Sequence, residues 1–405
     1  MAKEIRKVAV IGGGTMGSGI GQLIAQKGVM VVVKETGDER AEACKSRILR
    51  QLDKISNKPN LREEVEAARR CFSTTGSYDD LRDADIVIEA VFENMGVKKS
   101  VFQELNPLFP KRVIFTTNSS SLSIDEIASV TDRPDRFIGS HFFNPAVQRP
   151  LVELVCGSET SNETFETVRH FVEVVLGRIS ILVKGCPGYL VNRLLLPYLN
   201  EAAHLLTETT LTVKEIDARA RKFGWPMGPF ELLDFVGNDI AVNVAGILYR
   251  GYGERAKPVP LMDRMVELGR IGKKAGAGFY VESKSSGHED IKVVIDSEYP
   301  HRQEIDVDVG FNRMMAGLYN EAILCLEEGV APADVIETGA VLGIMFPMAL
   351  EGPLHYAQKY GLPNLLADLK RFEAQYGVRF KPAQLLEQLV AEGRTIFQAD
   401  AEEEW

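Results

Sequence analysis

The sequence predicts an α/β domain built on a parallel sheet, followed by two copies of one helical domain. Three observations lead to this prediction. Short apolar runs alternate with amphipathic stretches in the first half, long helical periodicities replace them from about Pro187, and polar pairs in the second half recur 120 positions apart. The chain has 405 residues, enough for two to four domains at roughly 100–200 residues each.

The first domain is predicted from the order of its segments. Amphipathic stretches of helical length lie at Met16–Lys27, Glu39–Ile55 and Lys98–Leu108. The apolar runs between and beyond them have the length of buried strands: Val8–Ile11, Val29–Val33, Ile86–Ala90, Val113–Phe115 and Phe137–Gly139. Continuous apolar strands separated by helices are typical of a parallel sheet covered on both faces. We therefore assign residues 1–186 to one α/β domain.

The helical half contains an internal repeat. A shift of 120 positions places Asn192-Arg193 on Asn312-Arg313 and Asn200-Glu201-Ala202 on Asn320-Glu321-Ala322. Shared helical periodicity explains matching apolar residues, but it does not explain coincident polar pairs. We interpret residues 187–282 and 308–405 as two copies of one helical domain, joined by a linker at 283–307.

Composition and charge exclude several classes of protein. There are 57 acidic and 47 basic residues, a net charge of −10, which argues against nucleic acid as a partner. No apolar run approaches the roughly 18–20 residues that span a bilayer, and the first residues lack the apolar core of a signal peptide. The five cysteines are scattered without a C-x-x-C pair, which predicts neither disulfides nor structural zinc. We expect a cytoplasmic protein with no membrane partner and no metal.

A dinucleotide-binding fingerprint follows the first predicted strand. Gly12, Gly14 and Gly17 form G-x-G-x-x-G between that strand and a helix, the context that the fingerprint requires. The first glycine permits a tight turn, the second lets a pyrophosphate approach the backbone, and the third lets the helix pack on the strand. Thr15 and Met16 open the helix whose N-terminus would hold the anion, and they complete the predicted loop.

The second predicted strand supplies the residue that selects the cofactor. A glycine-rich turn alone also fits an ordinary strand–helix connection. Here Glu35 ends the second strand, eighteen residues after Gly17, where a carboxylate accepts both ribose hydroxyls and repels a 2′-phosphate. The combination predicts NAD in preference to NADP, although the neighbouring Lys34 weakens that preference.

A histidine and a glutamate form a second candidate site. His141 follows a strand that ends at the carboxyl edge of the sheet, where such sheets bind ligands. Glu153 lies twelve residues later in another strand-like run. A carboxylate that bonds to a histidine fixes its tautomer and suits it to act as a general base. From the spacing alone, a buried structural imidazole explains the pattern equally well.

Six motifs together resemble the L-3-hydroxyacyl-CoA dehydrogenase family over residues 5–282. They are GGGTMGSG, IEAVFEN (88–94), TNSSSLSI (117–124), SHFFNP (140–145), PGYLVNR (187–193) and GWPMGPFELLD (224–234). The second helical copy is similar to the last domain of multifunctional fatty-acid oxidation proteins and of bacterial dehydrogenases with a duplicated C-terminal domain. The resemblance implies a Rossmann-like domain followed by two all-α domains of the 6-phosphogluconate-dehydrogenase C-terminal type. It also implies oxidation of (S)-3-hydroxyacyl-CoA to 3-ketoacyl-CoA with NAD.

The resemblance also assigns roles to matching residues. It makes His141 the catalytic base and Glu153 its partner, with Ser120 and Asn192 holding the substrate oxygen. The positions that match residues lining the nicotinamide end are Glu93 and Lys98, and Asn118 matches a further contact to the cofactor or the substrate. Ser119 stands where the family more often has threonine, which leaves open which of three adjacent serines acts, and Glu35 stands where it more often has aspartate.

One helical face offers a candidate site for the phosphates of coenzyme A. Arg47, Arg50, Lys54 and Lys58 recur at i, i+3, i+7 and i+11, so they share a face, and Lys54 is our candidate substrate contact. A solvated basic face explains the same run equally well.

Two other functions remain open at this point. One is a dehydrogenase of the same build that acts on a sugar acid without CoA, and the other is a catalytically silent NAD-binding relative. We expect an acyl-CoA substrate and either a monomer with an internal pseudo-dimer or a homodimer. A thiolase or hydratase partner is compatible with the sequence. The second copy has no His–Glu pair of its own, so we expect Asn312 and the rest of that copy to be structural.

Overall fold

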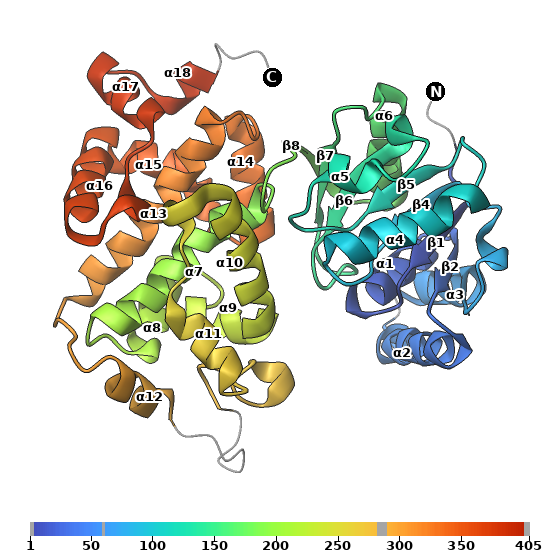
Figure 1. Ribbon diagram of the computed structural model, residues 1–405, viewed down its shortest axis with the longest axis horizontal. Helices are drawn as coiled ribbons and strands as arrows, with labels where there is room; N and C mark the ends of the chain where they lie inside the picture. The colour runs from blue at the N-terminus through green and yellow to red at the C-terminus, as the bar shows by residue number, and fades with distance from the viewer. Residues whose placement is uncertain (1–3, 59–60, 282–289, 401–405) are drawn as a thin grey trace. The chain divides into compact units, whose positions relative to one another are not determined.

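The computed structural model describes residues 4–58, 61–281 and 290–400. The chain divides into two compact units, Met1–Cys186 and Pro187–Trp405 (Figure 1). The division falls where strand-like runs give way to helical periodicity in the sequence. Each unit is therefore described by itself.

The first unit is built on a sheet of eight strands in the order β3-β2-β1-β4-β5-β6-β7-β8. The strands are β1 (Lys7–Ile11), β2 (Met30–Lys34), β3 (Phe72–Thr75), β4 (Ile86–Glu89), β5 (Ile114–Thr117), β6 (Phe137–Phe142), β7 (Leu151–Cys156) and β8 (Ile179–Lys184). The first six are parallel, which confirms the predicted Rossmann-like order.

The last two strands extend the predicted parallel sheet and add one antiparallel pairing to it. β7 runs antiparallel to β6, and β8 is parallel to β7. Only residues 143–150 connect β6 to β7, and a parallel connection needs a crossover of about a dozen residues or more. The short connection therefore forces the chain to reverse its direction.

Helices cover both faces of the sheet, as the sequence predicts. One face packs against α1 (Thr15–Gln26), α2 (Asp38–Ser56), α3 (Arg62–Cys71) and α6 (Asn162–His170) through a single apolar cluster. The other face packs against α4 (Met95–Leu105) and α5 (Ile124–Ala128), and Figure 1 shows α4 crossing in front of the strands. On that face the Phe102 ring of α4 lies 5.6 Å from Phe115 and 4.7 Å from Phe137.

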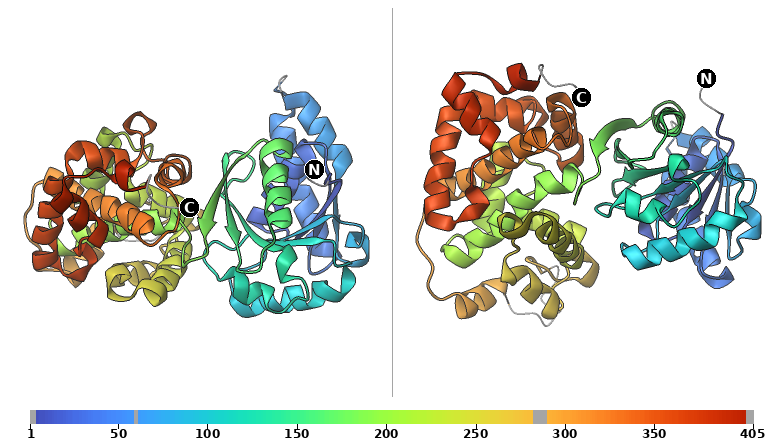
Figure 2. Two further views of the ribbon diagram at one scale, coloured as in Figure 1. Left: turned by 90° about the horizontal axis from the view of Figure 1, so that it is seen from above. Right: turned by 45° about the horizontal axis from the view of Figure 1, so that its top comes forward.

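The second unit is helical, and its helices follow the predicted repeat (Figures 1 and 2). The first copy contains α7 (Val191–Glu208), α8 (Val213–Phe223), α9 (Pro229–Val236), α10 (Asn238–Tyr252) and α11 (Pro260–Glu267). The second contains α13 (Val307–Glu327), α14 (Ala333–Gly339), α15 (Pro353–Tyr360), α16 (Leu362–Tyr376), α17 (Gln384–Glu392) and α18 (Ile396–Asp400). The helices α7 and α13 pack side by side between the two copies.

The spacing between equivalent helices changes along the repeat. The starts of α8 and α14 differ by 120 residues (213 to 333), whereas the starts of α9 and α15 differ by 124 (229 to 353). The second copy therefore carries four extra residues before α15. Phe346, from this longer connection, packs 5.4 Å from Trp225 of the first copy.

The segment predicted as a linker is ordered over its described part. Residues 282–289 lie outside the described residues, but α12 (Ile291–Glu298) follows them. Ile291 and Ile295 are buried one helical turn apart, so this segment has its own apolar face. Gln303 then pairs with Thr209 in a parallel bridge. Within the described residues, the connection between the copies is anchored to the unit.

Among the described residues, no single helix is long and apolar enough to cross a bilayer. Residues Pro229–Val236 and Asn238–Ala256 reach that length and composition only as a pair, which bends by 100°. Both of its helices pack against α7.

Candidate active site

The predicted site residues of the first unit come together because they follow parallel strands. Parallel strands present their carboxyl ends at one edge of the sheet. Five consecutive strands of the order, β2-β1-β4-β5-β6, end there. The segments at these ends supply Glu35 after β2, Gly12–Gly17 after β1, Glu93 after β4, Asn118 and Ser120 after β5, and His141 near the end of β6.

The glycine-rich loop has the geometry that a pyrophosphate site requires. Gly12 has a φ of +95°, and a Cβ there would lie 2.9 Å from the Ala90 carbonyl oxygen. A Cβ on Gly17 would lie 1.8 Å from the Gly12 oxygen, so the helix packs on the turn only with glycine. Gly14 differs, because a Cβ there meets no heavy atom of the described residues within 4 Å. The approach to this backbone and to the N-terminus of α1 is therefore open to an anion.

Glu35 is fixed beside this loop. Its Oε1 accepts a hydrogen bond from the Gly13 N–H at 2.8 Å, and its Oε2 accepts one from the Thr36 N–H at 3.1 Å. The Lys34 ammonium lies 3.8 Å from the centre of the Tyr78 ring, a cation–π contact. Lys34 is thus engaged by an aromatic ring, while Glu35 stands beside the loop at the position predicted to contact the ribose, which fits NAD.

Lys98 is buried beneath the site and does not line it. Its side chain is 1% exposed, and its Nζ lies 2.8 and 3.0 Å from the two Glu89 oxygens and 3.2 Å from Glu93 Oε2. An ammonium has three N–H donors, and these three contacts use them. Lys98 therefore positions Glu93. Sequence reasoning missed Glu89, although a carboxylate that ends an otherwise apolar strand was a usable signal.

Glu93 gathers the three adjacent serines. Its Oε1 accepts hydrogen bonds from Ser119 Oγ at 2.7 Å, Ser120 N at 2.8 Å, Ser120 Oγ at 3.2 Å and Ser121 Oγ at 3.2 Å. Burial raises the pKa of Glu93, but the Lys98 ammonium and the serine hydrogen bonds outweigh it and lower the pKa below its usual range. Ser119 and Ser121 are buried, whereas Ser120 is half-buried. Of the three, Ser120 is the serine whose surroundings admit contact with a ligand.

His141 and Glu153 face each other across two strands. They are direct partners in the antiparallel register of β6 and β7, an arrangement that places Cβ atoms about 4.5–5.5 Å apart. His141 Nδ1 lies 2.6 Å from Glu153 Oε2, and Glu153 is fully buried. The Phe143 ring lies 4.4 Å from the imidazole. The Asn118 side chain accepts the N–H of Phe142 at 2.8 Å and so joins the ends of β5 and β6.

The basic residues of α2 do not act as one group. Arg47 is half-buried and donates from Nη1 to the Gly13 carbonyl at 2.7 Å, so it supports the glycine-rich loop. Arg50 and Lys54 are exposed on α2, whereas Lys58 is exposed beyond the end of the helix at Ser56 and so does not share its face. The proposed face for phosphates is therefore smaller than the sequence suggested, with Lys54 at its centre.

Asn192 belongs to the second unit. It is half-buried in the first turn of α7. Its equivalent, Asn312, is exposed in the second turn of α13 and lines a small cavity with Phe223, Phe311 and Tyr319. The two asparagines thus have different local settings.

The chain is similar to known proteins in both sequence and structure. The family description "3-hydroxyacyl-CoA dehydrogenase, NAD binding domain" matches residues 7–186. The description of the C-terminal domain of the same family matches residues 188–282 and 310–400. The fatty acid oxidation complex subunit alpha of Shewanella amazonensis is 36% identical over 98% of this chain and 56% of the relative. The chain thus spans about half the length of the curated relatives it matches.

Two solved structures extend these matches. The 3-hydroxybutyryl-CoA dehydrogenase of Escherichia coli K12 has a TM-score of 0.85 at 28% identity, over 96% of this chain and 100% of that one. The (S)-3-hydroxybutyryl-CoA dehydrogenase of Ralstonia eutropha has a TM-score of 0.66 at 38% identity, over 69% of this chain and 100% of that one. The first unit is an NAD-binding domain. From these matches and the site geometry, the chain belongs to the 3-hydroxyacyl-CoA dehydrogenase family.

Proposed function

We propose that this protein oxidises (S)-3-hydroxyacyl-CoA to 3-ketoacyl-CoA with NAD as the hydride acceptor, a reaction of fatty-acid β-oxidation. The observation that carries the proposal is the His141–Glu153 pair, 2.6 Å apart, at the edge of the sheet that also carries the dinucleotide loop. The base and the loop that binds the cofactor can then act on the same substrate carbon, C3. Family membership supports the choice of a CoA thioester.

The proposed chemistry assigns one task to each side chain. With Nδ1 bonded to Glu153, His141 takes the proton of the C3 hydroxyl at Nε2. The buried Glu153 carboxylate stabilises the imidazolium that forms. Ser120, held by Glu93, orients the substrate oxygen. The resemblance to the family assigns the same task to Asn192. Bound NAD supplies the redox chemistry by accepting the hydride from C3.

The CoA moiety is proposed to bind along α2. Arg50 and Lys54 are exposed on this helix, Lys58 is exposed two residues after its end, and Arg47 joins the helix to the glycine-rich loop. Exposed cations attract the phosphate groups of a CoA thioester. The chain as a whole has a net charge of −10 and repels such an anion. The local excess of positive charge along α2 therefore supports this helix as the binding surface for the phosphates.

The test is NADH formation by the purified protein. We expect absorbance at the NADH wavelength with an (S)-3-hydroxyacyl-CoA and almost none with the free hydroxy acid or with sugar acids. A series of thioesters then defines the acyl chain length. Equal rates with thioester and free acid would contradict CoA recognition, and no NADH with any thioester would contradict the proposed activity.

A further inference from the structure

Arg193, the residue after Asn192, is clamped by the second helical copy. Its guanidinium is 1% exposed. Nε lies 2.5 Å from Glu321 Oε1, and Nη1 lies 2.8 Å from Glu328 Oε2. Glu321 belongs to α13, and Glu328 is the residue that caps its C-terminus. Since a buried guanidinium without counter-charges is strongly unfavourable, these two glutamates determine where Arg193 lies.

The same guanidinium contacts the helix that holds the start of α7. Arg193 stacks 4.6 Å from the centre of the Tyr252 ring. The Tyr252 hydroxyl donates to the Pro187 carbonyl at 2.9 Å. A Cβ on Gly251 would lie 2.5 Å from Pro187 Cγ, so α10 packs directly on this proline. Residues on both sides of Asn192 are therefore fixed by α10.

The turn between these two anchors is strained. Gly188 has a φ of +78° and Tyr189 a φ of +48°. For a tyrosine this left-handed conformation persists only where the surroundings impose it, and Tyr189 is 1% exposed. Strain at Tyr189, three residues before Asn192, indicates that packing imposes the path of the backbone that leads to this asparagine.

We propose that Glu321 and Glu328 of the second copy position Asn192 through Arg193, so that the second copy contributes to the reaction. This inference rests on the proposed role of Asn192 in holding the substrate oxygen. Arg193, Tyr252 and both glutamates are positioning residues, because they act through Asn192.

The repeat supplies an internal comparison. Arg313, equivalent to Arg193, pairs with Glu201 and Glu208 of α7 and lies 4.0 Å from the Tyr376 ring. The pairing is therefore reciprocal: each copy clamps the arginine of the other. The turn is not reciprocal, because α13 begins at Val307 and the positions equivalent to Gly188 and Tyr189 are helical. Only the clamp on Arg193 lies next to a strained turn.

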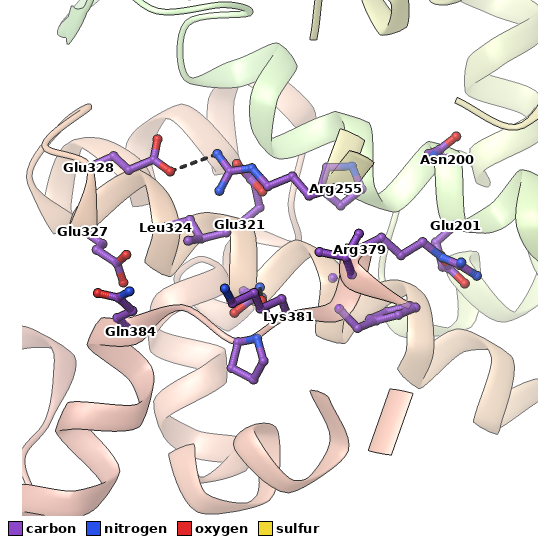
Figure 3. Close-up of a pocket in the computed structure, with 16 residues that line it drawn as sticks. Asn200, Glu201, Arg255, Glu321, Leu324, Glu327, Glu328, Arg379, Lys381 and Gln384 are labelled. Atoms are coloured by element: carbon purple, nitrogen blue, oxygen red, sulfur yellow. Dashed lines mark hydrogen bonds and ion pairs between the residues drawn. The ribbon is translucent and has the colours of Figure 1, made fainter. Parts of the chain in front are cut away.

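A cavity of about 220 Å³ between the copies is lined by both glutamates of the clamp, Glu321 and Glu328 (Figure 3). Glu328 lies at this cavity and also accepts from Arg255 at 2.9 Å, the pair joined by the dashed line in Figure 3. The equivalent Arg379 lies 2.9 Å from Glu208. Glu328 and Glu208 are 37% and 31% exposed, respectively, so a glutamine is accommodated equally well at both positions.

The experiment compares Glu328→Gln with its equivalent Glu208→Gln in the full chain. Each removes one charge from one arginine clamp, and we expect similar decreases in melting temperature. Glu328→Gln should lower kcat about tenfold while the KM for NAD stays unchanged, because misplacing a positioning group costs turnover. Glu208→Gln should keep kcat within about twofold, because Glu208 pairs with Arg313, whose neighbour Asn312 has no proposed role in the reaction. Tyr252→Phe and Tyr376→Phe repeat this comparison of kcat without a change of charge, because Tyr252 contacts Arg193 and Tyr376 contacts Arg313.

Two further measurements make the interpretation specific. In an Asn192→Ala background, Glu328→Gln should cause no further loss of kcat, because coupled residues are not additive. Hydrogen exchange should accelerate at residues 188–194 in Glu328→Gln and not in Glu208→Gln, and this result does not depend on activity. Equal kcat losses in the two variants, or unchanged exchange at 188–194, would overturn the inference. If the parent chain forms no NADH, the proposed function fails, and the exchange experiment still decides the inference.

Discussion

His141 Nδ1 lies 2.6 Å from Glu153 Oε2 because the two residues are direct partners in the antiparallel pair β6–β7. Side chains alternate between the faces of a strand, so a slip of one residue would send one partner to the opposite face. The reversal of the sheet after β6 therefore brings together two groups that are twelve residues apart. This hairpin register is what makes the pair a candidate for catalysis.

Replacing Glu153 tests whether the carboxylate matters electrostatically. Glu153→Gln keeps the size of the side chain but cannot stabilise an imidazolium, so kcat should fall by about 10²-fold or more. Isothermal titration should show unchanged NAD binding, because the glycine-rich loop is intact. Glu159→Gln, an exposed change outside β7, is the control. A Glu153→Gln enzyme with normal kcat would remove this residue from the mechanism.

Glu35 should exclude NADP. Its carboxylate is fixed by the Gly13 and Thr36 amides, so a 2′-phosphate would meet a like charge that cannot move away. We expect kcat/KM for NAD to exceed that for NADP by about 10²-fold or more, and Glu35→Ser to narrow the ratio. The exposed Glu39→Gln serves as a neighbouring control. Equal values in the parent enzyme would refute the assignment and indicate Lys34 or Arg40 as a phosphate partner.

Asp217 should make stability depend on pH. Burial raises its pKa from 3.8 to about 6, although the Phe230 N–H and the Tyr280 hydroxyl oppose the shift. The folded state thus holds this proton to higher pH than the unfolded state. Its stabilising effect is complete below pH 3.8 and is lost as the pH rises through about 6, with a slope of at most about 1.4 kcal/mol per pH unit.

Urea unfolding at pH 4.5, 5.5 and 7 measures this contribution. Asp217→Asn should remove the corresponding part of the slope, whereas the exposed Asp263→Asn should leave it unchanged. Identical slopes in the parent protein and in Asp217→Asn would show that Asp217 does not titrate in this window.

The second copy should replace a partner subunit. The helices α7 and α13 pack against each other within one chain, with reciprocal pairs such as Arg193–Glu321. Full-length protein should therefore be a monomer in light scattering. A chain ending near residue 300 should dimerise or aggregate, because it exposes the apolar face of α7 and leaves Arg193 without its counter-charges. An obligate full-length dimer joined through residues 187–282 would contradict this account.

Most of the sheet could be predicted because its central strands are continuous apolar runs. The edge strands β3 and β8 escaped prediction: β3 reads Phe-Ser-Thr-Thr, and β8 alternates buried with exposed residues. The reversal at β7 depends on a short connection, which local composition does not reveal. The repeat was readable because its polar pairs, such as Asn192-Arg193, recur at a fixed distance.

The motifs of the candidate site could be predicted from the sequence, but the burial of its individual side chains could not. The family resemblance placed Lys98 near the cofactor, and the structure buries it against Glu89. Similarly, three adjacent serines look alike in sequence, and only burial separates Ser120 from Ser119 and Ser121. The burial of a side chain depends on contacts between segments that are distant in sequence, so it becomes visible only in the folded structure.

The most direct test of the central claim is hydride transfer by a His141→Gln variant. With saturating NAD and a 3-hydroxyacyl-CoA that the parent enzyme oxidises, kcat for NADH formation should fall by about 10²–10⁴-fold, the usual contribution of a positioned general base. NAD affinity and melting temperature should stay close to those of the parent. Near-normal turnover by the folded variant would contradict the claim that His141 removes the hydroxyl proton.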